Sequence, residues 1–190
     1  PFALRPFGYR PVWVGYDPSS TGDAAGCVVV APPAVPGGKF RILERYQWKG
    51  GDFEEQAQAI KRLTERFNVA HIAIDTTGLG QGVFQLVKQF FPAVRGINYS
   101  VESKVAMVMK AQSVMRAGRL EFDAGWTDLC QSFIAIRKAM TASGRAFTFE
   151  ASRSEEASHA DMAWATMHAL FNEPLEGATT TNQSSMEIFG

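Results

Sequence analysis

The sequence predicts an α/β fold: a mixed sheet, made of a three-stranded antiparallel meander plus parallel strands, with helices on both faces. Two observations carry this prediction. Short β-rich runs separated by turn residues come first along the chain, and amphipathic helical segments then alternate with short apolar strands. At 190 residues, with 46% hydrophobic and 20% charged residues, the chain has the composition of one globular domain with a substantial core.

The meander is predicted by three segments joined by short turns. The first, PVWVGYD at 11–17, runs into the turn sequence DPSSTGD. The second, AAGCVVVAPP at 24–33, stops at two prolines, and the third, GGKFRILERYQWKGG at 37–51, alternates apolar and polar residues over 40–46. Consecutive strands with such short connections pair antiparallel.

The remaining elements alternate between helix and strand. Residues 53–67 have a helical period, because one face carries Phe53, Ala57, Ile60, Leu63 and Phe67. After it the sequence predicts a strand at 71–75, a helix at 80–91, a strand at 93–100, a helix at 103–118, an extended piece at 119–123, a helix at 126–140, a strand or hairpin arm at 145–151 and a helix at 158–171. This order is the one expected of a ribonuclease H-like fold.

Composition also predicts the domain boundaries. We expect an N-terminal linker at 1–11, the folded domain at 12–173, and a flexible tail at 174–190, which is polar, small and aperiodic. The start at Pro1 rather than Met suggests a domain of a longer protein. No stretch approaches the roughly 18 apolar residues of a membrane helix, and no signal-peptide pattern is present, so we expect no membrane partner.

The two cysteines, Cys27 and Cys130, lie far apart in the sequence and lack metal-ligand spacing. Each is surrounded by apolar residues. We therefore expect two buried, reduced thiols and a reducing, cytoplasmic setting.

The formal net charge of +0 argues against a chain that binds nucleic acid by bulk charge. Local charge is uneven, since two basic groups stand out: Arg95, Lys104, Lys110, Arg116 and Arg119, and then Arg137, Lys138, Arg145 and Arg153. Solvated helix faces explain any one of these residues. As a set they permit a surface that contacts phosphates.

Three carboxylates stand at special places in the predicted elements. Asp17 ends the first strand, Asp75 ends the fourth, and Asp161 lies in the first turn of the last helix. If the first and fourth strands are neighbours, Asp17 and Asp75 lie side by side, and a helix packed across the sheet brings Asp161 to the same point. Gathered carboxylates repel one another unless they are protonated or bound to cations. Oxygen-rich clusters of this kind suit Mg²⁺ or Mn²⁺, and two such ions can clamp the oxygens of a phosphoryl displacement.

Each acid also has a structural explanation. Asp17 begins a good turn with the proline and serines that follow it. Asp75 could cap its own turn, and Ser158 with Asp161 fits a capping box in which Asp161 is the third helical residue. The loop at 78–82 reads G-x-G-x-G, which lacks the last spacing of a dinucleotide fingerprint and the lysine of a P-loop, so a phosphate-binding loop is disfavoured.

Three segments together resemble a known family. VGYDPSSTGDAAGCVVV at 14–30, IAIDTTGLGQGVFQLV at 72–87 and SHADMAWATMHAL at 158–170 are similar, in this order, to the three acidic motifs of the nuclease (C-terminal) domain of the tailed-phage terminase large subunit. The resemblance covers most of the chain. It implies a ribonuclease H-like, metal-dependent endonuclease that cuts concatemeric double-stranded viral DNA during genome packaging.

The resemblance also implies roles for the acids. Asp17, Asp75 and Asp161 would bind two Mg²⁺ or Mn²⁺ ions, with Asp17 bridging both ions and each of the others on one. The second acid of the family is often Glu, so the shorter side chain of Asp75 leaves the metal preference open. Asp23 matches a further recurring acid of the first motif, although a hairpin-turn role fits it as well.

Two more residues are candidates near this site. His159, two residues before Asp161, would touch substrate or the outer ligands of a metal, or else simply lie at the helix entry. Lys104, at a helix start, could meet a phosphate. His168 shares the helical face of Asp161 and is expected in the core.

Partners and location follow from the resemblance alone. It implies double-stranded DNA, the packaging ATPase domain of the same polypeptide, the portal and the small terminase subunit as partners, and the cytoplasm of the infected bacterial host as the location. Two alternatives stay open: another ribonuclease H-like nuclease, of the junction-resolvase or transposase type, and a catalytically silent module that binds DNA or a partner protein. A nuclease should gain thermal stability from Mn²⁺, which separates it from the silent module.

Overall fold

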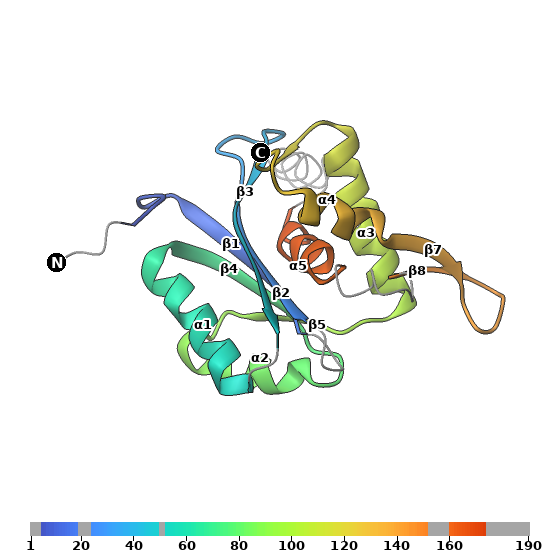
Figure 1. Cartoon of the computed structure of the whole chain (residues 1–190), viewed down its shortest axis with the longest axis horizontal. Coiled ribbons are helices and arrows are strands. Elements are labelled where there is room, and N and C mark those ends of the chain that lie inside the picture. The colour runs from blue at the N-terminus through green and yellow to red at the C-terminus, as the bar shows by residue number, and fades with distance from the viewer. Residues whose placement is uncertain (1–4, 19–23, 50–51, 152–159, 174–190) are drawn as a thin grey trace, which may run out of the picture.

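The computed structural model describes residues 5–18, 24–49, 52–151 and 160–173, and a six-stranded sheet lies at the centre of these residues (Figure 1). Its strands are β1 (Pro11–Asp17), β2 (Ala24–Ala31), β3 (Phe40–Lys49), β4 (Asn68–Asp75), β5 (Arg95–Ile97) and β6 (Leu120–Glu121). The helices are α1 (Phe53–Arg66), α2 (Gly80–Phe90), α3 (Val101–Arg116), α4 (Thr127–Ile134) and α5 (Asp161–Leu170). A separate hairpin is formed by β7 (Ile136–Met140) and β8 (Phe147–Ala151).

The strand order of the large sheet is β5-β4-β1-β2-β3-β6. β1, β2 and β3 pair antiparallel, whereas β4 lies parallel to β1, β5 parallel to β4, and β6 parallel to β3. The predicted meander with added parallel strands is therefore confirmed. Because β1 and β4 run the same way side by side, their carboxyl ends lie at the same edge of the sheet.

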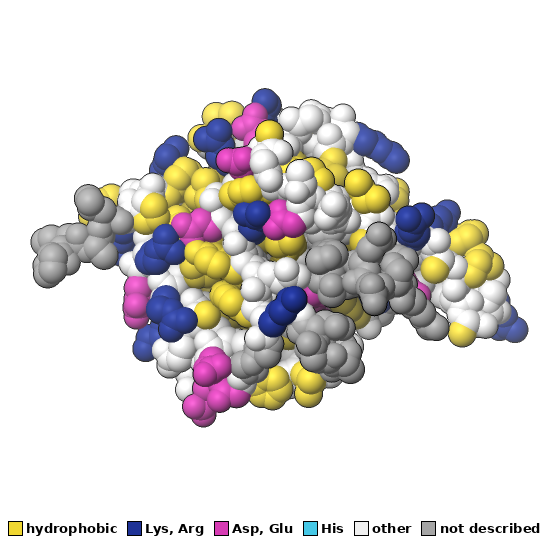
Figure 2. All heavy atoms as spheres, viewed as in Figure 1, with side chains coloured by type: hydrophobic (Ala, Val, Ile, Leu, Met, Phe, Trp, Pro, Cys, Tyr) yellow, Lys and Arg dark blue, Asp and Glu magenta, His cyan; other side chains and the backbone are white. Residues whose placement is uncertain are grey.

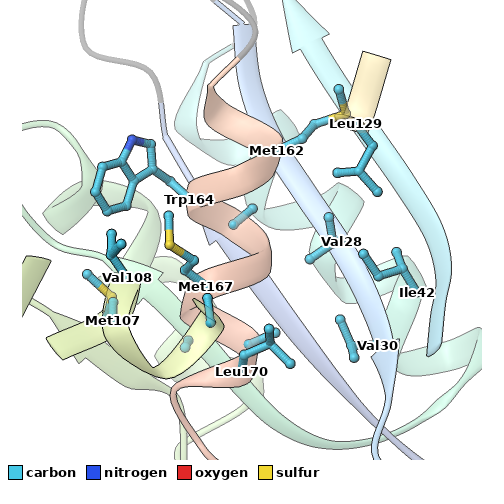
Figure 3. Close-up of a cluster of buried hydrophobic side chains, with 14 of the residues drawn as sticks. Val28, Val30, Ile42, Met107, Val108, Leu129, Met162, Trp164, Met167 and Leu170 are labelled. Atoms are coloured by element: carbon cyan, nitrogen blue, oxygen red, sulfur yellow. The ribbon is translucent and has the colours of Figure 1, made fainter. Parts of the chain in front are cut away.

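Helices cover both faces of the sheet, as predicted (Figure 1). On one face α1 and α2 pack over the buried side chains of β1 and β4, and the apolar stripe of α1 supplies Ala57, Ile60 and Leu63 to this core. On the other face α5 lies directly against β1 and β2, and α3 and α4 pack over it. The second core is shown in Figure 3, where side chains of α5 meet those of the strands and outer helices: Val28, Val30, Ile42, Met107, Val108, Leu129, Met162, Trp164, Met167 and Leu170.

Helix α5 is the most deeply placed element of this layer, since every residue from Met162 to Leu170 is buried. Two strand glycines allow its backbone to approach the sheet. A Cβ atom on Gly15 would lie 1.8 Å from the carbonyl oxygen of Ala165, and one on Gly26 would lie 2.5 Å from the carbonyl oxygen of Asp161. The start of the helix is held from α4, because the buried hydroxyl of Ser132 accepts a hydrogen bond from the Ala163 N–H at 2.7 Å. The two glycines and the bond from Ala163 to Ser132 therefore allow α5 to pack closely against β1 and β2.

The prediction of one helix over 126–140 is wrong for the second half of this segment. The helix ends at Ile134, and Ile136–Met140 is the strand β7, paired antiparallel with β8 from Ile136↔Ala151 to Met140↔Phe147. The five residues IRKAM are too few to show a period that separates strand from helix, and the pairing partner decides between the two. The hairpin extends away from the sheet in Figure 1.

Smaller differences concern exposure and length. Cys27 is buried as expected, but Cys130 is exposed on α4. The strand predicted at 93–100 is reduced to 95–97. Of the helices formed by the described residues, none has the length and apolar character needed to cross a bilayer.

Candidate active site

Asp17 and Asp75 occupy the ends of two neighbouring strands. The parallel register pairs Tyr16 with Ile74, so the acids that follow these residues lie at adjacent positions on the sheet edge. Both are buried, with 7% of Asp17 and 6% of Asp75 exposed. The structure thus places these two carboxylates as the strand order predicts.

Asp161 reaches the same place from the helix layer. Gly26 is the antiparallel partner of Asp17, and the main chain of Asp161 packs against Gly26. One carboxylate oxygen of Asp161, Oδ2, is buried. The helix start therefore lies over the strand pair that carries Asp17.

The capping-box explanation assigns Asp161 to the wrong position of the helix. The residue before the helix is Ala160, which makes no side-chain capping bond, so Asp161 is the first helical residue and not the third. Ser158, His159 and Asp23 lie outside the described residues.

The carboxylates share one electrostatic environment. Burial raises the pKa of Asp17 well above its usual value, and the charges of Asp161 and Asp75 raise it further. The charge of Lys104 and the hydroxyl of Tyr99 act in the opposite direction on this pKa. A buried carboxylate with two acidic neighbours is stabilised in its ionised form by a cation.

Asp75 has a structural role as well. The Thr77 N–H donates a hydrogen bond of 2.8 Å to Oδ1 of Asp75, so the acid caps its own turn as the alternative explanation predicts. Burial raises the pKa of Asp75, and the bonds from Thr77 and the charge of Lys104 oppose this rise. The glycines after it serve the turn: Gly78 has a φ of 61°, and a Cβ on Gly80 would lie 1.8 Å from the Asp75 carbonyl oxygen.

Lys104 is brought to the acids by the first turn of α3. Its Nζ lies 5.1 Å from the centre of the Tyr99 ring and 5.6 Å from that of Trp164, at distances typical of cation–π contacts. Its charge lowers the pKa of both Asp17 and Asp75. Lys104 therefore lies beside the carboxylates, where a residue that contacts a DNA phosphate would be needed.

Three other members of the first basic group make contacts within the fold. Lys110 Nζ donates to the carbonyl oxygen of Phe171 at 2.8 Å, and Arg119 forms an ion pair of 2.9 Å with Glu173. Arg95 lies over the Phe171 ring. On the face shown in Figure 2, basic and acidic side chains are interspersed. Lys104 is the member of the first group whose charge acts on the acids.

The donor set fits a hard divalent cation. Among the residues the structure describes, no three acidic, histidine or cysteine side chains already stand in positions that would hold one ion. The three carboxylates are nevertheless oxygen donors of the kind that Mg²⁺ and Mn²⁺ take, and two of them are held at a rigid sheet edge. Burial raises the pKa of Asp17 most and the charges of Asp161 and Asp75 raise it further, and bound cations would offset both effects.

Without metal, the stability of the domain should depend on pH through Asp17. Because its pKa is raised in the folded state, its contribution to stability is present below the ordinary value of 3.8 and is lost as the pH rises through the raised value. We expect the metal-free wild type to lose stability relative to Asp17→Asn as the pH rises above about 4. Melting temperatures of both proteins in EDTA, measured as a function of pH, check this.

The comparison with Asp17→Asn removes a competing effect. Burial lowers the pKa of His71 and of His168 to about 4, so these side chains destabilise both proteins as the pH falls. If the difference in melting temperature between the two proteins stays constant with pH, the pKa of Asp17 is not raised in the folded protein.

The sequence prediction did not single out Gly15, Gly26 or Tyr99 as residues that shape this site. A glycine inside a buried strand signals close backbone approach, so Gly15 and Gly26 had a detectable signal. Tyr99, in the loop after β5, had none. His168 is buried as expected, but its contacts at the site come from residues distant in sequence.

Comparison with known proteins places this geometry in a family. The chain matches the terminase RNaseH-like domain over residues 14–173. It is 65% identical over 185 residues to the terminase ATPase subunit of Escherichia phage P2, covering 97% of this chain and 31% of the relative. It is 43% identical over 176 residues to the probable terminase ATPase subunit of Haemophilus phage HP1 (strain HP1c1), covering 92% of this chain and 29% of that protein. The chain thus spans less than a third of the length of these relatives.

Solved structures show the same fold. The large terminase nuclease from thermophilic phage G20c with bound magnesium superposes with a TM-score of 0.71 at 18% identity, covering 89% of this chain and 84% of the other. The HK97 bacteriophage large terminase gives a TM-score of 0.65 at 12% identity, covering 89% of this chain and 40% of that one. The predicted ribonuclease H-like fold is confirmed. Because the matched region contains all three acidic motifs and most of the chain, this chain belongs to the terminase RNaseH-like domain family.

Proposed function

We propose that this domain is the nuclease of a terminase large subunit, a metal-dependent endonuclease that cuts concatemeric double-stranded viral DNA during genome packaging. One observation carries the proposal: β1, β4 and α5 bring Asp17, Asp75 and Asp161 to one edge of the sheet, where their charges act on one another. The large terminase nuclease from thermophilic phage G20c, which has the same fold, has been solved with bound magnesium, cobalt and zinc, which supports a divalent metal.

The three carboxylates would hold two Mg²⁺ or Mn²⁺ ions. Asp17, which is buried and feels the charges of both other acids, would bind both ions, with Asp75 on one and Asp161 on the other. When bound, such ions activate water for attack on a phosphodiester and stabilise the departing oxygen. The protein keeps the donors rigid through the sheet edge and the buried helix, and it excludes water from the side of the carboxylates that faces the core.

Lys104 would contact a DNA phosphate next to the acids. Its ammonium group is beside the carboxylates and is held over two aromatic rings, so its position is restricted. We expect Lys104→Met to weaken DNA binding and to reduce the slope of log affinity against log salt by about 1. Fluorescence anisotropy with duplex DNA in EDTA, over a range of salt, measures this. Lys61→Met, an exposed lysine on α1, is the control, and equal salt slopes for the two variants would exclude the phosphate contact.

The larger assembly is also part of the proposal. The matched relatives are terminase ATPase subunits of which this chain covers less than a third, which supports a packaging ATPase domain in the same polypeptide. The portal, the small terminase subunit and the cytoplasm of the infected host are proposed from the role of such enzymes in packaging.

Cleavage of supercoiled plasmid tests the function directly. With Mn²⁺ or Mg²⁺ the domain should nick or linearise the plasmid, and EDTA should prevent this. Thermal melts of the same protein should show a gain in stability with Mn²⁺. A domain that neither cuts DNA nor binds Mn²⁺ would contradict the nuclease proposal and favour a silent module.

A further inference from the structure

A chain of polar contacts, buried at His168 and exposed at Thr77, lies next to the three acids. His168, on α5 about two turns after Asp161, is 0% exposed. Its Nδ1 lies 3.0 Å from the main-chain oxygen of Tyr16, the residue that precedes Asp17. Its Nε2 lies 2.7 Å from the hydroxyl of Tyr99. Both ring nitrogens are thus engaged.

Chemistry sets the direction of these hydrogen bonds. A carbonyl oxygen can only accept, so Nδ1 of His168 carries the hydrogen that it donates to Tyr16. Complete burial lowers the pKa of His168 to about 4, which leaves the ring neutral near pH 7 and Nε2 an acceptor. The Tyr99 hydroxyl therefore donates to Nε2, and the Asp17 carboxylate is a second acceptor for the same hydrogen. The tautomer of His168 follows from its surroundings.

Tyr99 is also tied to the turn of Asp75. Its main-chain N–H donates to the Thr77 hydroxyl at 2.9 Å, and the Thr77 N–H donates to Oδ1 of Asp75 at 2.8 Å. The Tyr99 ring packs on the rings of Trp164 and His168, with centroids 5.4 Å and 5.6 Å away. The chain of contacts therefore joins the β4 turn, the loop after β5, helix α5 and the end of β1.

These elements are the ones that carry the acids. Carboxylates brought together repel one another, and this repulsion favours any movement that separates β1, the β4 turn and α5. A hydrogen-bond network whose buried member, His168, has a partner on each ring nitrogen resists such movement. Partners of this kind also orient the ligands of metal ions.

We propose that Tyr99 and His168 are positioning residues that hold Asp17, Asp75 and Asp161 in place for divalent cations. The inference rests on the nuclease function proposed above. Neither residue touches the metal in this proposal. They act by fixing the main chain beside Asp17 and the turn of Asp75 relative to the helix that begins with Asp161.

Binding of Mn²⁺, measured by isothermal titration calorimetry on this chain, tests the proposal. Tyr99→Phe keeps the ring and removes only the hydroxyl, and it should raise the Kd for Mn²⁺ about 10–100-fold. His168→Gln, which offers one donor and one acceptor, should lose less affinity than His168→Leu. Val87→Ala is the control, since this residue is buried on α2 in the opposite core and its loss lowers stability without reaching the acids.

The possible results separate this proposal from the nuclease proposal. If the wild type binds Mn²⁺ and Tyr99→Phe binds it equally well, the positioning role is wrong while the nuclease function stands. If the wild type does not bind Mn²⁺, both proposals fail. If Val87→Ala weakens binding as much as Tyr99→Phe, the effect is one of general stability and the positioning role is overturned.

A second measurement needs no metal. The ¹⁵N resonances of the His168 ring in EDTA, assigned through His168→Gln, should show a neutral ring with hydrogen on Nδ1 from about pH 5 to pH 8. Tyr99→Phe should shift the Nε2 resonance. A hydrogen on Nε2 in the neutral wild type would overturn the proposed chain of hydrogen bonds, whatever the metal titration shows.

Discussion

Asp17→Asn is expected to abolish DNA cleavage while leaving the metal-free domain at least as stable as the wild type. The amide has nearly the same size, so it fits the buried position at the end of β1. It removes the negative charge that would bind both cations, and we expect the cleavage rate to fall at least about 10³-fold, equivalent to several kcal/mol of lost transition-state stabilisation. In EDTA the same change removes a buried negative charge, because burial and then the charges of Asp161 and Asp75 raise the pKa of Asp17 in the wild type.

Two measurements on the same protein check this expectation. Plasmid nicking with Mn²⁺ reports cleavage, and thermal melts in EDTA and in Mn²⁺ report stability and metal binding. The matched control is Asp123→Asn, an exposed acid in the turn before α4, which should cut DNA and respond to Mn²⁺ like the wild type. Wild-type cleavage by Asp17→Asn would exclude Asp17 as a metal ligand. A clear loss of stability in EDTA would show that its carboxylate is needed by the fold itself.

Gly15→Ala should strongly destabilise the domain. The added Cβ would lie 1.8 Å from the Ala165 carbonyl oxygen and 2.9 Å from the Ala169 nitrogen, which are backbone atoms of a buried helix. Neither side can move away easily, because β1 is held between two strands and α5 is covered by α3 and α4. Overpacking costs about 1–3 kcal/mol and sometimes more, and we expect at least about 3 kcal/mol here, or a fall in melting temperature of about 6–12 °C.

Urea unfolding and thermal melts of the variant measure this loss. Gly125→Ala is the matched control, because the nearest atom to its added Cβ is the flexible side chain of Asp123, 3.1 Å away. That variant should unfold within about 0.5 kcal/mol of the wild type. A Gly15→Ala protein as stable as Gly125→Ala would mean that α5 does not pack against β1 as closely as the structure indicates.

Local patterns predicted most of the elements. The alternation in β3 and the apolar stripe of α1 place their buried residues on one side, and both elements form as predicted. The failure over 126–140 has a specific cause: β7 exists because β8 pairs with it, and the pairing depends on a turn and a partner strand that the run 136–140 does not encode.

The site divides in the same way between local and distant information. Short contiguous motifs are enough to locate the acids at strand and helix ends and to show which family they resemble. The position of β4 beside β1, and the close approach of α5 that Gly15 and Gly26 allow, become visible only in the folded chain. The same is true of the contacts of His168, because its partners Tyr16 and Tyr99 lie 152 and 69 positions earlier in the chain. The physical reason is that hydrogen bonds and close packing depend on distances in space, and a buried side chain finds its partners only after strands and helix have closed around it.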